Sequence, residues 1–258
     1  MLYYLVMNLN AIKQNKKLRD FFLVLILCLL VWHFSPAKEL MYQFIYDVQT
    51  RQQPVQNKQE IDRVLRQFET IPIEHLDSTY LDWTKITQPN YQKILKNTSF
   101  YKIPGKAIFQ FLVGDFRVKH FLPQDDYYTY YIRTLRNDAP IYFLIQKELL
   151  YKLLALQDAL EELGYNKEGF DVINGFRHPA YNEKVGGASK SRHILGEALD
   201  LRINDINGDG RRTQKDKQIV LDLLEKHIIK DKGGIGRYPG TMSVHFDVRG
   251  YKARWDKQ

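Results

Sequence analysis

Two histidines and an aspartate in the C-terminal half of the chain have the residue types and spacing of a metal site. Six residues separate His193 from Asp200 in the run HILGEALD, and His245 lies in the later run VHFDV. If the segments around Asp200 and His245 are neighbouring strands, the three side chains can converge on one point. Two imidazoles and one carboxylate, with a fourth position open, are what a catalytic zinc ion needs. A histidine on a strand is nevertheless more often a packed residue than a ligand.

Short strands and amphipathic helices would position these residues. Leucines at periods of three and four predict a long helix that ends at Gly164. The expected elements are a helix near 146–163, strands at 170–176, 198–203 and 244–248, and an amphipathic helix over 219–228. Period two places His245 and Asp247 on the same face of the last strand. The expected strands and helices do not alternate regularly, as they would in a doubly wound parallel sheet. We therefore expect an α+β domain with a small antiparallel sheet and flanking helices.

A second metal signal directly follows the strand that carries Asp200. Residues 205–216 read DINGDGRRTQKD and fit the calcium loop D-x-N-x-D-G, with Gly210 at its sharp turn. The predicted Ca²⁺ ligands are the side chains of Asp205, Asn207, Asp209 and Asp216 and the backbone carbonyl of Arg211. The alternative is a hairpin turn, which also favours Asn-Gly and Asp-Gly pairs. A calcium ion here would be structural and would anchor the helix that follows.

The run GFRHPAYNEKVGGASKSRHILGEALDL at residues 175–201 resembles the M15 family of zinc peptidases, which cut D-Ala-D-Ala or related peptide bonds in bacterial cell walls. Matching elements continue in the same order with GRYP at 236–239 and VHFDVRG at 244–250. Several ordered elements arise by chance far less often than one short motif. The resemblance covers about residues 108–254 and implies the fold shared by D-Ala-D-Ala peptidases and hedgehog domains.

The resemblance implies a role for individual residues. It makes His193, Asp200 and His245 the zinc ligands. It gives Arg177 the task of binding a substrate carboxylate or polarising the scissile carbonyl, for which a planar guanidinium is suited. A surface salt bridge is the alternative for Arg177. Ser191 would form a hydrogen bond at the substrate site, or would only form a loop turn.

The general base is an open point. Several branches of the family place an acidic residue or a histidine a few positions before the last zinc histidine, where this chain has GTMS at 240–243. Asp247 is then the nearest candidate, either as the catalytic base or as a carboxylate that orients His245. Glu197 and His178 are further candidates, and the order among the three stays open.

The resemblance implies a zinc metallopeptidase that hydrolyses peptide bonds of peptidoglycan stem peptides or cross-links, as a D-Ala-D-Ala carboxypeptidase or an endopeptidase. Which bond is cut stays open, because D,D and L,D cleavage differ in pocket details that spacing does not show. The alternative is a catalytically inactive cell-wall-binding module with zinc and calcium, since hedgehog domains of similar fold act by binding partners.

The N-terminal part has the pattern of an export signal. Residues 21–34 read FFLVLILCLLVWHF and follow four basic residues between positions 13 and 19. A basic segment before a short apolar run is typical of a signal peptide or a membrane anchor. Small residues up to Ala37 fit cleavage there, and retention in the membrane stays open. In both cases we expect the rest of the chain in the periplasm or at the outer face of the membrane.

Composition limits the remaining classes of function. The 258 residues carry a net charge of +8 and one cysteine, which excludes a disulfide framework and a Cys-rich metal site. The basic residues are scattered and an export signal is present, which argues against a nucleic-acid partner. We expect three parts: the leader at 1–37, an N-terminal spacer with a helical segment at 38–107, and the zinc peptidase domain at 108–258.

Overall fold

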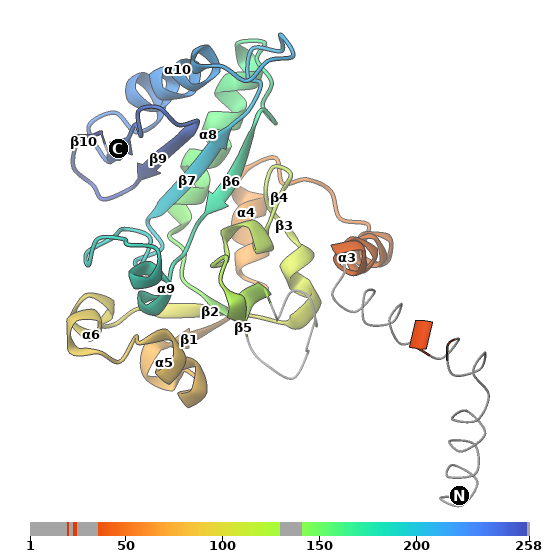
Figure 1. The fold of residues 1–258 in the computed structure, drawn as a ribbon, viewed down its shortest axis with the longest axis vertical. Coiled ribbons are helices and arrows are strands. Elements are labelled where there is room, and N and C mark those ends of the chain that lie inside the picture. Colours follow the sequence, from red (N-terminus) through yellow and green to blue (C-terminus); the bar gives the residue numbers. More distant parts are fainter. Residues whose placement is uncertain (1–19, 21–22, 25–35, 130–140, 257–258) are drawn as a thin grey trace, which may run out of the picture.

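A computed structural model describes Asp20, Leu23, Val24 and residues 36–129 and 141–256. Its main sheet has five strands in the order β10-β8-β9-β7-β6 (Figure 1). The strands are β6 (Phe170–Asn174), β7 (Ala198–Ile203), β8 (Gly234–Gly236), β9 (Ser243–Asp247) and β10 (Ala253–Trp255). Neighbouring strands are antiparallel except β10 and β8, which run parallel at one edge.

Strands β7 and β9 pair directly in this sheet, and their register places Asp200 opposite His245. On the other side of β7, strand β6 places Asn174 opposite Asp200, after an irregularity in the register. All residues of β7 except Arg202 are buried, as expected for a strand that is covered on both faces. The convergence of the Asp200 and His245 segments therefore follows from strand pairing.

The long helix α8 (Lys147–Glu162) is the helix that the leucine spacing predicts. The leucines of its stripe are buried, namely Leu149, Leu150, Leu153, Leu154 and Leu160. Gly164 follows with a φ of +74°, a left-handed conformation that glycine adopts without strain and that ends a helix.

Two shorter helices lie near the strands that carry the predicted ligands. Helix α9 (Pro179–Lys184) begins after His178, whose side chain caps it. Helix α10 (Gln214–Leu223) contacts β7 and β9 and continues as a π-helical turn, Leu224–Ile228. It begins five residues before the apolar pattern expected at 219, because Thr213 caps it.

The residues before position 108 hold more regular structure than the one short helix expected there. The helices are α3 (Pro36–Thr50), α4 (Lys58–Leu65), α5 (Ser78–Thr84) and α6 (Pro89–Leu95). Strands β1 (Glu69–Pro72) and β2 (Ser99–Ile103) also lie there, with a 3₁₀ segment at Ile73–His75.

Several elements join this part to the following one. Strand β5 (Ile141–Phe143) completes a second sheet of the order β1-β2-β5, and a 3₁₀ segment, Gly105–Phe109, crosses position 108. After it, a hairpin joins β3 (Phe111–Val113) to β4 (Phe116–Arg117), and a third 3₁₀ segment lies at Val118–Phe121.

One hydrophobic core continues across position 108. It includes Ile61 and Phe100 from the preceding segment and Leu150 and Phe246 from the following one. The expected α+β class, with small, mainly antiparallel sheets and flanking helices, is confirmed.

The predicted leader lies almost wholly outside the described residues, and cleavage at Ala37 stays a prediction. Within the parts of the chain that are described, no helix combines the length and the apolar character that a membrane span requires.

Candidate active site

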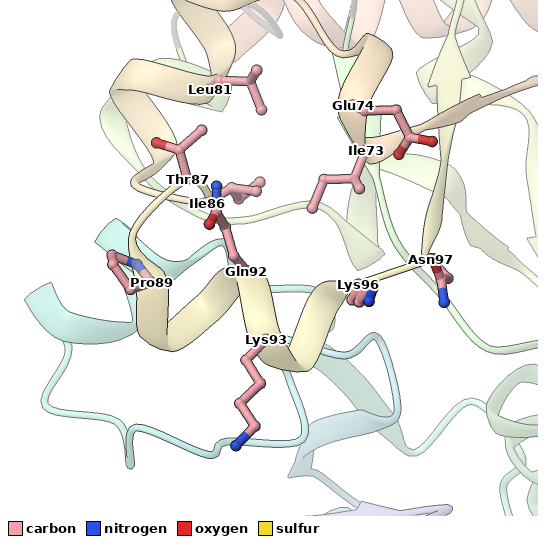
Figure 2. Close-up of a pocket in the computed structure, with 10 residues that line it drawn as sticks. All are labelled: Ile73, Glu74, Leu81, Ile86, Thr87, Pro89, Gln92, Lys93, Lys96 and Asn97. Atoms are coloured by element: carbon pink, nitrogen blue, oxygen red, sulfur yellow. The ribbon is translucent and has the colours of Figure 1, made fainter.

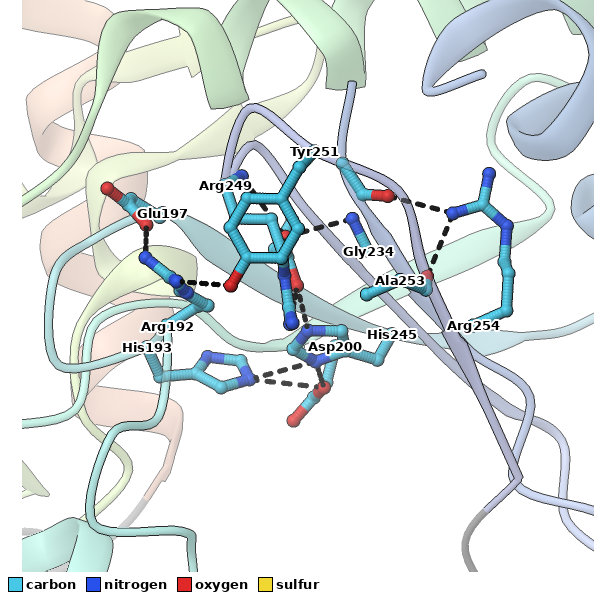
Figure 3. A network of polar contacts seen from close by, with 12 residues as sticks. Arg192, His193, Glu197, Asp200, Gly234, His245, Arg249, Tyr251, Ala253 and Arg254 are labelled. Carbon is cyan, nitrogen blue, oxygen red and sulfur yellow. Dashed lines mark hydrogen bonds and ion pairs between the residues drawn. The ribbon is translucent and has the colours of Figure 1, made fainter. Parts of the chain in front are cut away.

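His193, Asp200 and His245 form a buried group in which one ligand atom of each lies within 4.8 Å of the other two (Figure 3). Nδ1 of His245 is 2.8 Å from Oδ1 of Asp200, and Nε2 of His193 is 3.2 Å from the same oxygen. These two ring nitrogens are 3.2 Å apart. Among the described residues, this is the one set of three or more His, Cys, Asp or Glu side chains arranged in this way.

The second ring nitrogen of each histidine is held by an acceptor. Nδ1 of His193 lies 2.7 Å from the carbonyl oxygen of Gly175, so this nitrogen carries a hydrogen. Nε2 of His245 lies 3.2 Å from Oδ2 of Asp247. Such contacts fix the tautomer and the orientation of metal-binding histidines. Position 175 requires glycine, because a Cβ atom there would lie only 2.6 Å from the carbonyl oxygen of Phe121.

The pKa shifts of Asp200 and His193 suit a divalent cation, whereas a cation bound at His245 would displace a proton from its ring. Burial opposes charge on Asp200, but His193 and His245 hold the pKa of its carboxyl well below its usual range. Burial lowers the pKa of His193, so this ring is neutral at neutral pH, as a metal ligand must be. At His245 burial acts in the same direction, but hydrogen bonds to Asp200 and Asp247 outweigh it and raise the pKa. Two imidazole nitrogens and one carboxylate oxygen thus fit a zinc ion.

A cavity of about 300 Å³ adjoins this group. The described residues that line it are Arg177, Gly187, Ala188, Lys190, Ser191, Arg192, His193, Tyr238, His245, Arg249 and Trp255. Four of them are lysine or arginine, and no aspartate or glutamate is among them. Arg177, Arg192 and Arg249 are each paired with a carboxylate, so Lys190 carries the uncompensated positive charge of this wall among the described residues. Its ammonium can attract an anionic ligand.

Arg177 connects the cavity to the metal-ligand group. One Nη of its guanidinium donates a hydrogen bond to Oδ2 of Asp200, while Oδ1 faces the histidines. The side chain of Arg177 is 12% exposed, so this ion pair is buried and is not the surface salt bridge considered as an alternative. Its Nε has no hydrogen-bond partner among the described residues. Arg177 therefore orients the ligand carboxylate and keeps one unused donor.

Asp247 lies on the far side of His245 from the metal-ligand atoms. Its side chain is fully buried, and it accepts hydrogen bonds from the backbone N–H of Gly234 at 2.9 Å and from Arg249 Nε at 2.8 Å. Burial opposes its ionisation, but His245 and Arg249 hold the pKa of the carboxyl below its usual range. Asp247 is not among the residues that line the cavity. These contacts favour the orienting role over that of a catalytic base.

The other two candidate bases are engaged elsewhere. Glu197 forms an ion pair with Arg192, with 3.0 Å between Oε2 and Nη1 (Figure 3). His178 is buried, and its Nε2 lies 2.8 Å from Oδ2 of Asp125. Ser191, by contrast, lines the cavity, and its hydrogen bond to a substrate stays a prediction.

Several residues of the cavity wall were given no role from the sequence, among them Arg249, Tyr238 and Trp255. Arg249 lies within the VHFDVRG segment and Tyr238 within the GRYP segment, so the motifs covered both residues but did not indicate their roles. Burial raises the pKa of Tyr238 to about 12, so its hydroxyl stays protonated at neutral pH and can donate a hydrogen bond. The Trp255 ring centroid is 5.1 Å from that of His245, and its position near the C-terminus gave no indication of this contact.

The predicted calcium loop forms a compact turn through its own hydrogen bonds. Asp205 accepts hydrogen bonds from the backbone N–H groups of Gly208 and Gly210 at 2.9 and 2.8 Å. Asp216 is buried, accepts from Ile206 N–H at 2.9 Å, and forms a capping box with Thr213. Both readings of the loop stay open, and calcium binding stays a prediction.

A larger cavity, of about 620 Å³, shares no lining residue with the cavity at the metal-ligand group and is lined by the 3₁₀ segment Ile73–His75, by α5 and α6 and by the adjoining loops (Figure 2). Its lining residues come from positions 73–97 and include Ile73, Leu81 and Ile86. It holds no histidine, and its charged side chains, Glu74, Lys93 and Lys96, do not form a metal-ligand set.

Comparison with known families shows which protein family the chain belongs to. A sequence model of the family described as Peptidoglycan L,D-endopeptidase MepK matches residues 124–255, just over half of the chain. The chain belongs to this M15 peptidase family. At the family level it is a peptidoglycan-hydrolysing peptidase, and the match contains the metal-ligand group and every residue of the adjoining cavity wall. No curated protein and no solved structure matches the chain.

Proposed function

We propose that the protein is an exported zinc endopeptidase that cleaves L,D-peptide bonds in the cross-links of peptidoglycan. One observation carries the proposal: the buried group of His193, Asp200 and His245 lies within the stretch that matches the L,D-endopeptidase family. A zinc ion bound there would polarise the scissile carbonyl and acidify a water molecule.

The residues around the metal-ligand group support this activity. Arg177 holds the carboxylate of Asp200 in place through a buried ion pair. Peptidoglycan stem peptides carry free carboxylates, which the ammonium of Lys190 on the cavity wall would attract. The protonated hydroxyl of Tyr238 can donate a hydrogen bond to a substrate oxygen.

Export and calcium binding belong to the same proposal. The leader pattern at 13–37 supports transport out of the cytoplasm, either as a signal peptide or as a membrane anchor. The loop at 205–216 would bind Ca²⁺ in a compartment where this ion is abundant, through the oxygens of Asp205, Asn207, Asp209 and Asp216 and the carbonyl of Arg211.

The test combines elemental analysis with hydrolysis of purified cross-linked muropeptides. We expect one zinc ion at the metal-ligand group and cleavage of dimers joined by an L,D-peptide bond, but not of dimers joined by a D,D bond. His193→Ala should abolish both zinc binding and cleavage. His227→Ala is the matched control, because His227 is exposed on the π-helical turn and should leave both unchanged.

Two results would contradict the proposal. Iron in place of zinc in the purified protein would overturn the metal assignment, because two histidines and a carboxylate also bind Fe(II). Full zinc occupancy without turnover of any cross-linked muropeptide would favour the inactive cell-wall-binding module.

A further inference from the structure

A second cavity, of about 220 Å³, adjoins the segment that carries Arg177. Its lining residues are Trp83, Asp125, Asp126, His178, Ala180, Tyr181 and Lys184. Arg177 lines the cavity at the metal-ligand group and the next residue, His178, lines this one. The two cavities are therefore lined by consecutive residues of one segment, which is the continuity on which a substrate with two connected parts would depend.

Aromatic rings form one wall of the second cavity. Trp83 of α5 is 37% exposed, and its ring centroid lies 4.3 Å from that of Tyr127 and 4.8 Å from that of His178. His178 is itself fixed by Asp125, which is buried. The indole is therefore held in place by packed rings while part of its surface stays accessible to a ligand.

Polar groups of both signs complete the wall. Asp126 has a 95% exposed side chain, and its Oδ2 lies 3.1 Å from Nζ of Lys184. This pair offers hydrogen-bond acceptors and donors at the edge of the aromatic surface. With two carboxylates and one ammonium, the second cavity lacks the one-sided positive charge of the cavity at the metal-ligand group.

The surrounding helices make the wall a fixed structure. Figure 1 shows α5 and α6 beside α9, and α5 contacts α9 directly. Glu183 of α9 accepts hydrogen bonds from Lys85 at 2.7 Å and from Tyr91 of α6 at 3.1 Å. Trp83 lies outside the stretch that matches the family, so it is a contribution of this chain's N-terminal segment.

We propose that this second cavity binds a neutral sugar ring of the peptidoglycan glycan strand, stacked on Trp83, while the peptide lies in the cavity at the metal-ligand group. The inference rests on the proposed function and extends it to a second part of the substrate. A volume below the range of about 300–1,000 Å³ that drug-sized ligands occupy suits a single ring. An ammonium group would also suit aromatic rings and carboxylates, but the ammonium of Lys184 disfavours a second cation at this wall.

The first test measures sugar binding directly, in the full chain and without catalysis. We expect oligomers of N-acetylglucosamine to bind to the wild-type protein in calorimetry, and Trp83→Ala to weaken binding roughly threefold to tenfold, as loss of an aromatic stacking contact predicts. Asp126→Ala should also weaken it, and it removes an exposed side chain that folding does not need. Phe44→Ala is the matched control, because Phe44 is an aromatic residue of α3 that is 68% exposed.

The second test separates this inference from the proposed function. Cross-linked peptides are compared with and without their disaccharides, and Trp83→Ala should raise KM for the sugar-bearing substrate alone, with kcat unchanged. His193→Ala should still bind the oligomers. Equal oligomer binding by wild type, Trp83→Ala and Asp126→Ala, or no binding by any, would overturn the sugar site. If the wild-type protein binds the oligomers but hydrolyses neither substrate, the result would instead count against the proposed peptidase activity.

Discussion

Asp247 contacts His245 at Nε2, the ring nitrogen that faces away from Asp200, with 3.2 Å between the two atoms. The two residues lie two positions apart on β9, so their side chains share one face of the strand. A carboxylate in this position holds the hydrogen on Nε2 and leaves Nδ1 for a metal ion. Asp247 does not line the cavity at the metal-ligand group, where a catalytic base would contact the substrate.

Asp247→Asn should therefore act on metal affinity and only weakly on the chemical step. Loss of a carboxylate that orients a metal-bound histidine costs about 10- to 100-fold in affinity, and we expect that loss for zinc in a competition titration with a chelator. At saturating zinc, kcat should change by less than about tenfold. Asp222→Asn, at an ion-paired position on α10, is the control.

The opposite pattern would reassign Asp247. A catalytic base contributes about 10²- to 10⁴-fold, so a fall of that size in kcat with unchanged zinc affinity would identify the residue as the base.

Lys190 should determine preference for substrates with free carboxylates. It lines the cavity at the metal-ligand group, and within the described part of the chain it takes part in no ion pair. Lys190→Glu reverses the charge at that wall, so KM should rise for peptides with free carboxylates and rise much less for the same peptides with amidated carboxyls. Lys215→Glu on α10 should leave both values unchanged. An equal rise for both substrates would show that charge recognition is not the cause.

The convergence of His193, Asp200 and His245 could be predicted from the sequence because an ordered set of motifs named these residues, and strand periodicity was compatible with their convergence. The period of two along a strand placed His245 and Asp247 on the same face, and only six residues separate His193 from Asp200, so these two side chains had to lie near each other. Arg249 and Tyr238 lay inside the same motifs without a signal for their roles. Trp255 was not predictable, because its contact with His245 depends on the parallel pairing of β10 with β8, which no local pattern indicates.

Helix α3 was not predicted, for a different reason. In α3 the apolar residues at helical spacing, Leu40, Phe44 and Val48, are exposed, so the usual relation between an apolar stripe and a buried face fails. The helix packs on the core through Tyr42 and Tyr46, and ion pairs join it to residues far along the chain. Asp47 pairs with Arg117 at 2.8 Å, and Glu39 pairs with Lys119 at 2.7 Å.

Calcium should stabilise the folded protein if the loop at 205–216 binds it. A ligand at 10- to 100-fold above its Kd adds roughly 1.4–2.7 kcal/mol, which is a shift of several degrees in Tm for a chain of this size. We expect this shift on adding millimolar Ca²⁺ to the chelator-treated protein, and its loss in Asp209→Ala, which removes the ligand oxygen. Asp231→Ala is the control at another exposed aspartate. An unchanged Tm would favour the turn that the loop's own hydrogen bonds already stabilise.

His120 should make the stability of the fold depend on pH. Its Nδ1 accepts a hydrogen bond from the backbone N–H of Arg117 at 3.0 Å, which requires a neutral ring. Burial, with a smaller effect from Lys119 and Arg117, lowers its pKa from 6.5 to about 4. Between these values the unfolded chain binds a proton that the folded chain does not. The stabilising contribution is therefore complete above pH 6.5 and is lost as the pH falls toward 4.

The free energy of unfolding should accordingly fall by up to about 1.4 kcal/mol per pH unit within that window because of His120. Urea titrations of the metal-free protein at several pH values, with His120→Asn beside the wild type, isolate this contribution, since the metal-ligand histidines are common to both. The asparagine oxygen can accept the same backbone hydrogen bond but does not titrate, so the variant should show a shallower pH dependence. His75→Asn, at an exposed position, should follow the wild type. If His120→Asn loses stability in parallel with the wild type across the window, another group is responsible for the pH dependence.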